Sequence, residues 1–153
     1  GNQWFFGMRC HIGVDAASGL VHSAVSTAAN VHELNTAADR VHGEERVIYG
    51  DAGHIGIEKR DAFKDCEAEM RIAMKPGQRR VLPDTPEGRL LDLIETAKAH
   101  FRAKVEHPFR IIKCQFGFRK VHYRGIIKND LKLKMLFALA NLWIVRERCP
   151  ETA

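Results

Sequence analysis

Hydrophobic residues near the start of the chain concentrate in two segments with the character of β-strands. Residues Trp4 to Val14 and Leu20 to Thr27 are rich in β-branched and aromatic side chains, which favour extended backbone. Between them lies the turn-forming cluster from Asp15 to Gly19. The pattern therefore predicts a hairpin in which Asp15 is a turn residue.

The pattern changes to helical spacing after this hairpin. Asn30 and Glu33 have the spacing of a capping box, which satisfies free backbone N–H groups at the start of a helix. The apolar positions that follow, up to Val41, recur at helical spacing, and Gly43 is typical of a helix end. We therefore expect a helix over this segment.

Two short apolar runs in the middle of the chain predict buried strands. The first is Arg46 to Gly50, with Asp51 at its carboxyl end, and the second is Met70 to Met74. A short helix is expected between them, over Glu58 to Asp65. Pro76-Gly77 is expected to stop the second strand, because proline lacks a backbone N–H.

The rest of the chain is predicted to be mostly helical. Thr85-Pro86 marks a helix start, because proline is favoured in the first helical turn. Pro108 lies inside this long helix and is expected to kink it, and Phe116-Gly117 closes it. A basic loop is expected over Gln78 to Pro86, and the long helix over Thr85 to Gln115. A short strand or turn is expected over Arg119 to Gly125, followed by a final helix over about Asp130 to Arg148.

This order of elements predicts an α/β fold with one mixed sheet, flanking helices and a helical C-terminal part. A chain of 153 residues is long enough for one domain with its own hydrophobic core. The longest apolar run, Met135 to Val145, has 11 residues, whereas a bilayer span needs roughly 20. We therefore expect a single domain over residues 1–153, a buried helix at this run and no membrane partner.

Cysteine usage and the start of the chain bear on the compartment. The 4 cysteines are scattered without a CxxC pair, and the 8 histidines lack the spacing of a zinc site. The chain does not open with a basic and apolar secretory leader. These features predict free thiols in a reducing cytoplasm.

Charge is distributed unevenly along the chain. From Lys98 onward there are 13 basic and 4 acidic side chains, whereas the preceding part has 11 basic and 15 acidic ones. A basic half suits a protein that places one face on a polyanion such as DNA. The alternative is a solvated basic helix surface.

Two groups of residues are candidates for chemistry. Asp51 follows an apolar strand, and ligands gather at the carboxyl ends of strands in α/β sheets; alternatively, Asp51 caps the next helix. Arg102, Glu106 and Lys113 fall within roughly 40° of one another on the predicted long helix. Such a stripe can bind phosphates, or it can consist of surface ion pairs.

Four stretches of the chain resemble the DDE transposases of bacterial insertion sequences, in the group named after the fifth insertion sequence. They are GNQWFFGMRCHIGVDAASGLVHSAVSTAANVHEL, YGDAGHIGIEKR, RAKVEHPFRIIKCQFGFRKVHYRG and LFALANLW, which together span Gly1 to about Arg148. The resemblance implies an RNase H-like fold. It also implies three acids that bind two Mg²⁺ or Mn²⁺ ions for cleavage and strand transfer of transposon-end DNA.

Individual residues can be matched to the motifs of these transposases. The second acid falls on Asp51, in the context GDAG, and the final acid falls on Glu106. Arg102 and Lys113 match the arginine and lysine of the family's Y-x₂-R-x₃-E-x₆-K pattern. Two positions depart from the family, because tyrosine is replaced by Ala99 in this pattern and by His54 after GDAG.

The resemblance also bears on activity and partners. The family's first acid precedes the GNQW segment, so we expect this chain to be a truncated catalytic domain that lacks its first strand. It would then be a fragment of a metal-dependent transposase that does not cleave DNA on its own. Alternatively, it is an inactive DNA-binding remnant that can still bind transposon ends or dimerise with an intact copy. Double-stranded DNA is the expected partner, held by a basic segment interleaved with Phe118 and Tyr123: Arg119, Lys120, Arg124 and Lys128.

Overall fold

The structure is a computed structural model that describes residues 7–146 and 148. Trp4 to Phe6 of the predicted first strand therefore lie outside the described residues. The chain divides into two compact units. Unit 1 comprises Gly1–Arg40 and Lys104–Ala153, and unit 2 comprises Val41–Ala103.

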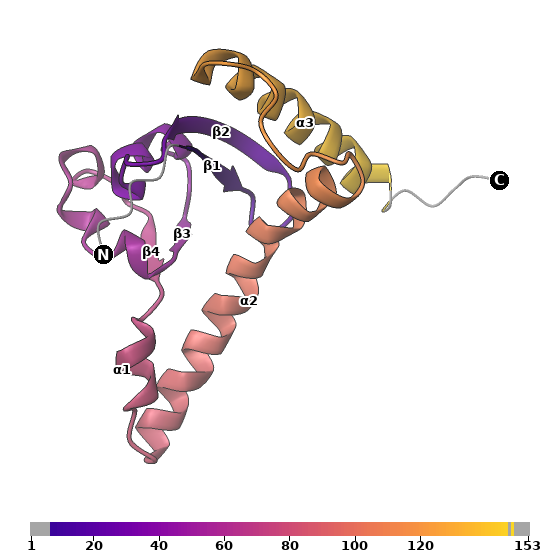
Figure 1. The fold of residues 1–153 in the computed structure, drawn as a ribbon. Coiled ribbons are helices and arrows are strands. Elements are labelled where there is room, and N and C mark those ends of the chain that lie inside the picture. The colour runs from indigo at the N-terminus through magenta and orange to yellow at the C-terminus, as the bar shows by residue number, and fades with distance from the viewer. Residues whose placement is uncertain (1–6, 147, 149–153) are drawn as a thin grey trace, which may run out of the picture. The chain divides into compact units, whose positions relative to one another are not determined.

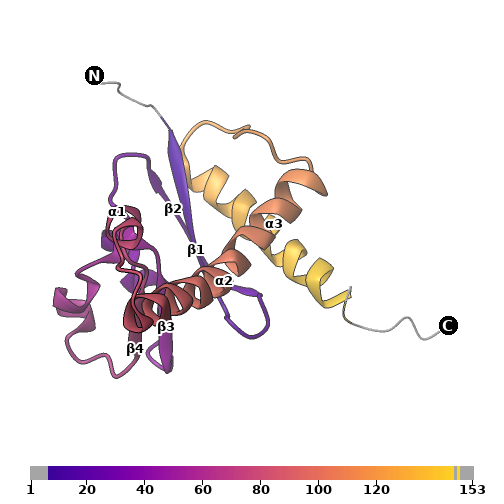
Figure 2. The ribbon, with the colours of Figure 1, turned by 90° about the horizontal axis from the view of Figure 1, so that it is seen from below.

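The strands and the C-terminal helices occur in the predicted order (Figures 1 and 2). The strands are β1 (Met8–Val14), β2 (Val21–Ala28), β3 (Val47–Gly50) and β4 (Glu69–Ile72). The α-helices are α1 (Pro76–Arg80), α2 (Pro86–Cys114) and α3 (Ile126–Arg146). Short 3-10 helices fill the segments between β2 and β4: η1 (Glu33–Thr36), η2 (Ala38–Arg40), η3 (Ala52–His54), η4 (Ile57–Lys59) and η5 (Asp61–Phe63).

The predicted hairpin is confirmed. β1 and β2 pair antiparallel from Met8 opposite Ala28 to Val14 opposite Val21. Asp15 is a turn residue, because its Oδ1 accepts hydrogen bonds from the backbone N–H and the hydroxyl of Ser18, both at 2.5 Å. These two bonds place the pKa of Asp15 below its ordinary value. Its carboxylate stabilises the hairpin turn.

The predicted helix from Asn30 to Gly43 is wrong, because this segment forms two 3-10 helices instead. The N-cap of η1 is His32, whose side chain accepts from the backbone N–H of Leu34. Polar side chains bind carbonyl oxygens that an α-helix would use in its own ladder. Thr36 binds the carbonyl of Glu33, and Arg40 binds those of Glu33 and Thr36. Local polar contacts thus overrode the apolar spacing.

Two further boundaries differ from prediction. The expected helix over Glu58 to Asp65 is divided into η4 and η5, because Arg60 between them has extended backbone (φ −80°, ψ 141°). The expected basic loop over Gln78 to Pro86 begins inside helix α1, because Pro76 occupies its first turn. The same proline therefore ends the strand region and starts a helix.

Both long C-terminal helices that the sequence predicts are present, although their bounds differ from the predicted ones. α2 extends without a break through Pro108, which is fully buried, to Cys114. The expected kink at Pro108 stays a prediction. Residues Arg119 to Gly125 form a loop rather than a strand, and α3 begins at Ile126, four positions before the predicted start. No helix among the described residues combines the length and apolar character that a bilayer span requires.

The strands form two sheets of two strands each. β1 and β2 form the antiparallel pair, while β3 and β4 run parallel from Val47 opposite Glu69 to Gly50 opposite Ile72. The mixture of antiparallel and parallel pairing agrees with an α/β class. In the described part of the chain, no strand pairing joins the two sheets into the single mixed sheet that the sequence predicted.

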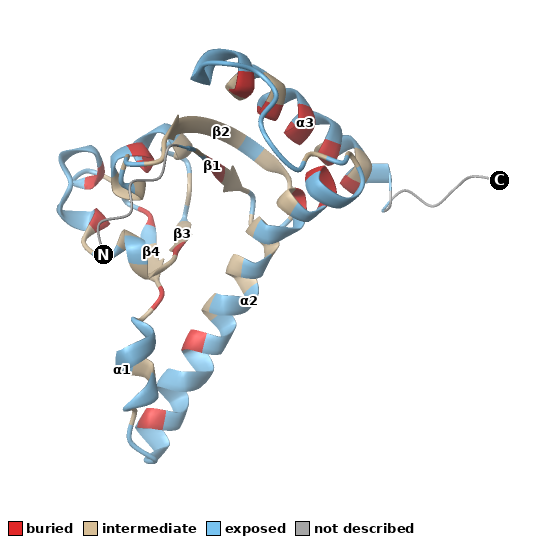
Figure 3. Ribbon diagram, in the orientation of Figure 1, coloured by how far each residue is buried: buried red, intermediate tan, exposed pale blue. Residues whose placement is uncertain are grey.

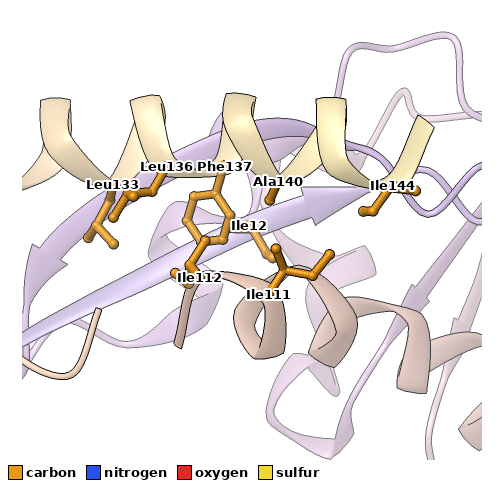
Figure 4. Packing of buried hydrophobic residues seen from close by; sticks show 8 residues of the cluster. All are labelled: Ile12, Ile111, Ile112, Leu133, Leu136, Phe137, Ala140 and Ile144. Carbon is orange, nitrogen blue, oxygen red and sulfur yellow. The ribbon is translucent and has the colours of Figure 1, made fainter. Parts of the chain in front are cut away.

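The core of unit 1 lies between the hairpin, the C-terminal part of α2 and one face of α3 (Figures 3 and 4). Phe137 of α3 packs edge-to-face on Phe109 of α2, with ring centroids 5.4 Å apart. The predicted burial of the apolar run from Met135 to Val145 is confirmed for one face of the helix only. The buried apolar residues of this core are Ile12, Ile111, Ile112, Leu133, Leu136, Phe137, Ala140 and Ile144.

Candidate functional site

Asp51 lies at the carboxyl end of β3, directly after the buried Gly50. Its extended backbone (φ −82°, ψ 178°) places the carboxylate over the start of η3. Oδ1 accepts from the backbone N–H of Gly53 at 2.9 Å and lies 2.8 Å from Nδ1 of His54. Asp51 therefore caps the following short helix, and it also stands at a strand end where α/β proteins bind ligands.

The electrostatic surroundings of Asp51 favour its charged form. Partial burial raises its pKa, but the hydrogen bond and charge of His54, the N–H of Gly53 and the charge of Arg102 lower it more. The net result is a pKa below the ordinary value, so the side chain is a carboxylate at neutral pH. Its side chain is 42% exposed, so an ion or a phosphate in solution can reach it.

Helix α2 is anchored beside the carboxyl ends of β3 and β4 by three contacts within unit 2. The ring of Phe101 stacks on Tyr49 of β3, with centroids 4.6 Å apart. The ammonium group of Lys98 donates to the carbonyl of Ile72, the last residue of β4, at 3.0 Å. Since Arg102 directly follows Phe101, these contacts hold its guanidinium within electrostatic range of Asp51.

The third contact is a buried carboxylate. Glu95 is 6% exposed, and its Oε2 accepts from the backbone N–H of Met74 at 2.8 Å. Its Oε1 pairs with Lys98 at 2.7 Å. Each oxygen of Glu95 is thus bound, as a buried charge requires. The pair connects α2 to the backbone just after β4.

The remaining two residues of the predicted stripe, Glu106 and Lys113, lie further along α2 in unit 1, and both side chains are exposed. The Nζ of Lys113 lies 5.8 Å from the ring centroid of Phe109. Glu106 follows Arg102 by one helical turn, so the two side chains share a face of α2. If both acids bind one pair of metal ions, we expect the carboxylates of Asp51 and Glu106 to lie within about 8 Å of each other.

The loop between α2 and α3 carries most of the predicted DNA-binding residues. Arg119, Lys120 and Arg124 are exposed in this loop, and Lys128 is exposed on the first turn of α3. Asn129 is buried and holds the loop in place. Its amide nitrogen donates to the carbonyls of Tyr123 and Gly125, both at 2.7 Å, and its oxygen accepts from the N–H of Tyr123.

Aromatic rings support a further cation beside this loop. The Nζ of Lys132 lies 5.7 Å from the ring centroid of Phe118 and 5.4 Å from that of Tyr123. Tyr123 is 50% exposed. An exposed set of cations on a loop that is held by a buried amide is well suited to contact phosphates of a nucleic acid.

The family of the chain is decided by comparison with known protein families. The family described as "Transposase DDE domain" matches residues 1–142. The chain belongs to this family. Members of the DDE transposase family cleave and transfer DNA with divalent metal ions. The DNA substrate and the metal requirement expected from the sequence are therefore properties of its family. No solved structure matches the chain.

The donor set of this DDE domain is compatible with a divalent metal ion. Asp51 offers a hard carboxylate oxygen, the ligand that Mg²⁺ and Mn²⁺ prefer. The hydrogen bonds at Asp51 both end on Oδ1, so Oδ2 is the oxygen that can face an ion. Outer partners of this kind commonly orient carboxylates that bind metals. His54 is such a partner.

Two residues that matter for this site were missed by sequence reasoning. The sequence marks His54 only as a departure from the family's tyrosine, although its position three residues after Asp51 allows its side chain to reach back to that carboxylate. Asn129 belongs to none of the motifs in the sequence. Its signal in the sequence is a polar residue in the first turn of an apolar helix, four residues after the glycine that ends a basic loop.

Proposed function

We propose that this chain is part of the catalytic domain of a bacterial insertion-sequence transposase with an RNase H-like fold. The single observation that carries the proposal is the position of Asp51 of the GDAG segment at the carboxyl end of a parallel strand, in a chain whose family match covers residues 1–142. The hairpin followed by a parallel strand pair and helices is consistent with that fold.

Asp51 and Glu106 are proposed as the metal-binding carboxylates. These two residues would hold divalent ions, which when bound would supply activation of the attacking hydroxyl and charge stabilisation at the leaving oxygen of the phosphodiester. Mg²⁺ is the proposed ion, and Mn²⁺ is the alternative. Asp51 contributes a carboxylate that is charged at neutral pH and is oriented by His54 and the N–H of Gly53.

The cations on α2 are proposed to act on the phosphate groups. Arg102 lies near Asp51 and carries a guanidinium that can bind two phosphate oxygens at once. Lys113 supplies a second positive charge. The basic loop and the start of α3 would then hold the flanking duplex through Arg119, Lys120, Arg124 and Lys128. The reaction takes place on DNA in the bacterial cytoplasm.

A second candidate function is that of a DNA-binding remnant without catalytic activity. One observation favours it for this chain: Ala99 stands where the family's pattern has tyrosine. Under this alternative the chain binds transposon ends but does not cleave them.

Binding of Mn²⁺, measured by titration calorimetry, tests the proposed metal site. We expect Asp51→Ala and Glu106→Ala each to weaken binding strongly, while Asp15→Ala leaves it unchanged because Asp15 serves a turn. Equal affinity of the Asp51→Ala variant and the wild type would overturn the assignment. The same titration separates the two candidate functions, since Mn²⁺ binding that depends on Asp51 and Glu106 is expected only of the first.

A further inference from the structure

A stack of two aromatic rings joins the strand before Asp51 to the helix that carries Arg102. Tyr49 of β3 and Phe101 of α2 are half-buried, and their rings lie nearly parallel, with an angle of 19° between them and centroids 4.6 Å apart. Tyr49 precedes Asp51 by two positions, and Phe101 directly precedes Arg102. The stack therefore lies within two residues of both groups, along the backbone of a strand and of a helix.

The ring of Tyr49 is itself held from the neighbouring strand. Arg71 of β4 is its partner in the parallel ladder, and Nη1 of Arg71 donates to the hydroxyl oxygen of Tyr49 at 3.1 Å. Nε and Nη2 of the same guanidinium donate to the two carboxylate oxygens of Glu69, at 2.9 and 2.8 Å. Paired bonds between arginine and a carboxylate have a fixed geometry. Tyr49 thus offers Phe101 a surface whose position is set by β4.

The stack complements the polar anchors of α2. Glu95 and Lys98 bind backbone groups at the end of β4, about two turns and one turn before Arg102. Phe101 instead contacts β3, the strand that Asp51 follows. An α-helix turns by about 100° per residue, so a rotation about its axis would carry Arg102 away from Asp51. A ring stacked on β3 opposes this rotation directly before Arg102.

Arg102 is a side chain that needs such support. Its guanidinium stands on a long stem with many rotamers, and the residue is only half-buried. Its charge helps to lower the pKa of Asp51, which places the guanidinium near that carboxylate. A functional group has to be held within roughly 0.5 Å of its productive position by the packing of its neighbours. The packing of the adjacent Phe101 supplies this support.

We propose that Tyr49 and Phe101 are a positioning pair, whose stack holds the Arg102 guanidinium where it binds a DNA phosphate beside Asp51. This inference rests on the proposed function, in which Arg102 binds phosphate. The pair acts through Arg102, and neither ring has to touch DNA. A merely structural stack would stabilise unit 2 without a particular effect on Arg102, so the two roles predict different results.

NMR relaxation of the Arg102 Nε–H group, in the chain without DNA or metal, tests the positioning by itself. We expect the order parameter of this group to fall below about 0.6, the range of flexible groups, in Phe101→Leu. Phe101→Tyr keeps a ring for the stack and should restore the wild-type value. The matched control is Phe63→Leu, which alters a buried ring of the same unit (5% exposed) and should leave the Arg102 signal unchanged. An unchanged order parameter in Phe101→Leu overturns the proposal.

A double-mutant cycle tests whether this positioning contributes to DNA binding. Fluorescence anisotropy with a labelled duplex, in buffer without divalent ions, makes the result independent of the proposed metal site. We expect Arg102→Ala to weaken binding about tenfold and to reduce the slope of log affinity against log salt concentration by about 0.9. Phe101→Leu should reproduce part of both effects in the wild-type background and should have no effect in the Arg102→Ala background.

Two results of the cycle would overturn the proposal while leaving the role of Arg102 intact. Phe101→Leu that binds DNA like the wild type would show that the contact does not need the stack. Equal weakening by Phe101→Leu in both backgrounds would show that the ring serves folding alone. Unchanged affinity and slope in Arg102→Ala would refute the proposed phosphate contact, and the inference with it. If Phe101→Leu fails to fold, Tyr49→Leu removes the same stack from β3 and takes its place.

Discussion

The side chain of Asn141 forms a pair of hydrogen bonds with the backbone of Val21, 120 positions earlier in the chain. Its oxygen accepts from the N–H of Val21 at 2.8 Å, and its nitrogen donates to the carbonyl of the same residue at 2.7 Å. An amide side chain is the right group for this task because it offers one donor and one acceptor side by side. This contact explains a polar residue in the most apolar segment of α3.

The Asn141 contact leads to a prediction on stability. Asn141→Leu leaves two partly buried backbone groups of Val21 without their partner, so we expect the free energy of unfolding to fall by about 2 kcal/mol. Chemical denaturation followed by circular dichroism measures the change. Asn35→Ala, at an exposed position, is the control and should have little effect. An unchanged midpoint for Asn141→Leu would show that the contact contributes nothing.

The buried Glu95–Lys98 pair predicts a pH dependence of stability. Burial raises the pKa of Glu95, but Lys98 and the N–H of Met74 lower it more, so the folded-state pKa lies below the ordinary 4.5. The stabilisation is therefore complete above about pH 4.5 and is lost as the pH falls through the folded value. Glu95→Gln should be less stable than the wild type at pH 7, and this difference should shrink in acid.

Thermal unfolding across the acid range measures the Glu95 effect. Glu58→Gln, which alters an exposed glutamate in the same unit, is the matched control and should follow the wild-type curve. A stability difference between Glu95→Gln and the wild type that is equally large at pH 7 and pH 3 would contradict the prediction.

The hydrogen bond between His54 and Asp51 predicts an effect on metal affinity that rests on the proposed site. His54→Ala removes the partner that orients the carboxylate, and loss of such outer partners typically weakens metal binding about tenfold or more. His54→Gln keeps a donor and should recover part of the loss, whereas His122→Ala, at an exposed position, should change nothing. Calorimetric titration with Mn²⁺ measures all three, and an unweakened His54→Ala variant would count against the role of His54.

The basic loop predicts a steep salt dependence of DNA binding. Each phosphate contact should contribute about −0.9 to the slope of log affinity against log salt concentration. Reversing charge at Arg119, Lys120 and Arg124 together should flatten this slope, and Asp51→Ala should hardly alter it. The measurement is fluorescence anisotropy with a labelled duplex at several salt concentrations.

A matched control for the loop is charge reversal at three exposed cations of unit 2, Lys59, Arg60 and Lys64. This control should keep the wild-type slope, since only the position of the charges differs from the loop variant. Equal flattening in both variants would mean that DNA responds to net charge rather than to the loop. Absence of binding at low salt would mean that the basic half is a solvated surface.

Local sequence determined those elements of the fold in which neighbouring residues all favour the same secondary structure. The turn cluster around Asp15 joins two β-branched segments, so the hairpin could be predicted from these residues alone. Pro86 likewise marked the start of α2, because proline fits the first turn of a helix and few other helical positions. The four-residue strand before Asp51 was likewise evident from its apolar side chains.

The segment after the hairpin was predicted incorrectly because two local signals compete there. Apolar spacing after Asn30 favours an α-helix, but the side chains of Thr36 and Arg40 bind backbone carbonyls and favour tighter 3-10 turns. Helix propensity is a matter of tenths of a kcal/mol per residue, so a few such bonds reverse the outcome. Periodicity alone does not contain this information.

The sequence by itself determined the family and the candidate acids, because the order and spacing of motifs such as GDAG are local properties of the chain. Only the tertiary structure decided which polar side chains serve the candidate site and which serve packing. Asn129 holds the basic loop, Asn141 binds the backbone of Val21, and Glu95 binds the backbone after β4. The physical reason is that a buried polar group must find its hydrogen-bond partner in space, and that partner can lie a few residues away or more than a hundred.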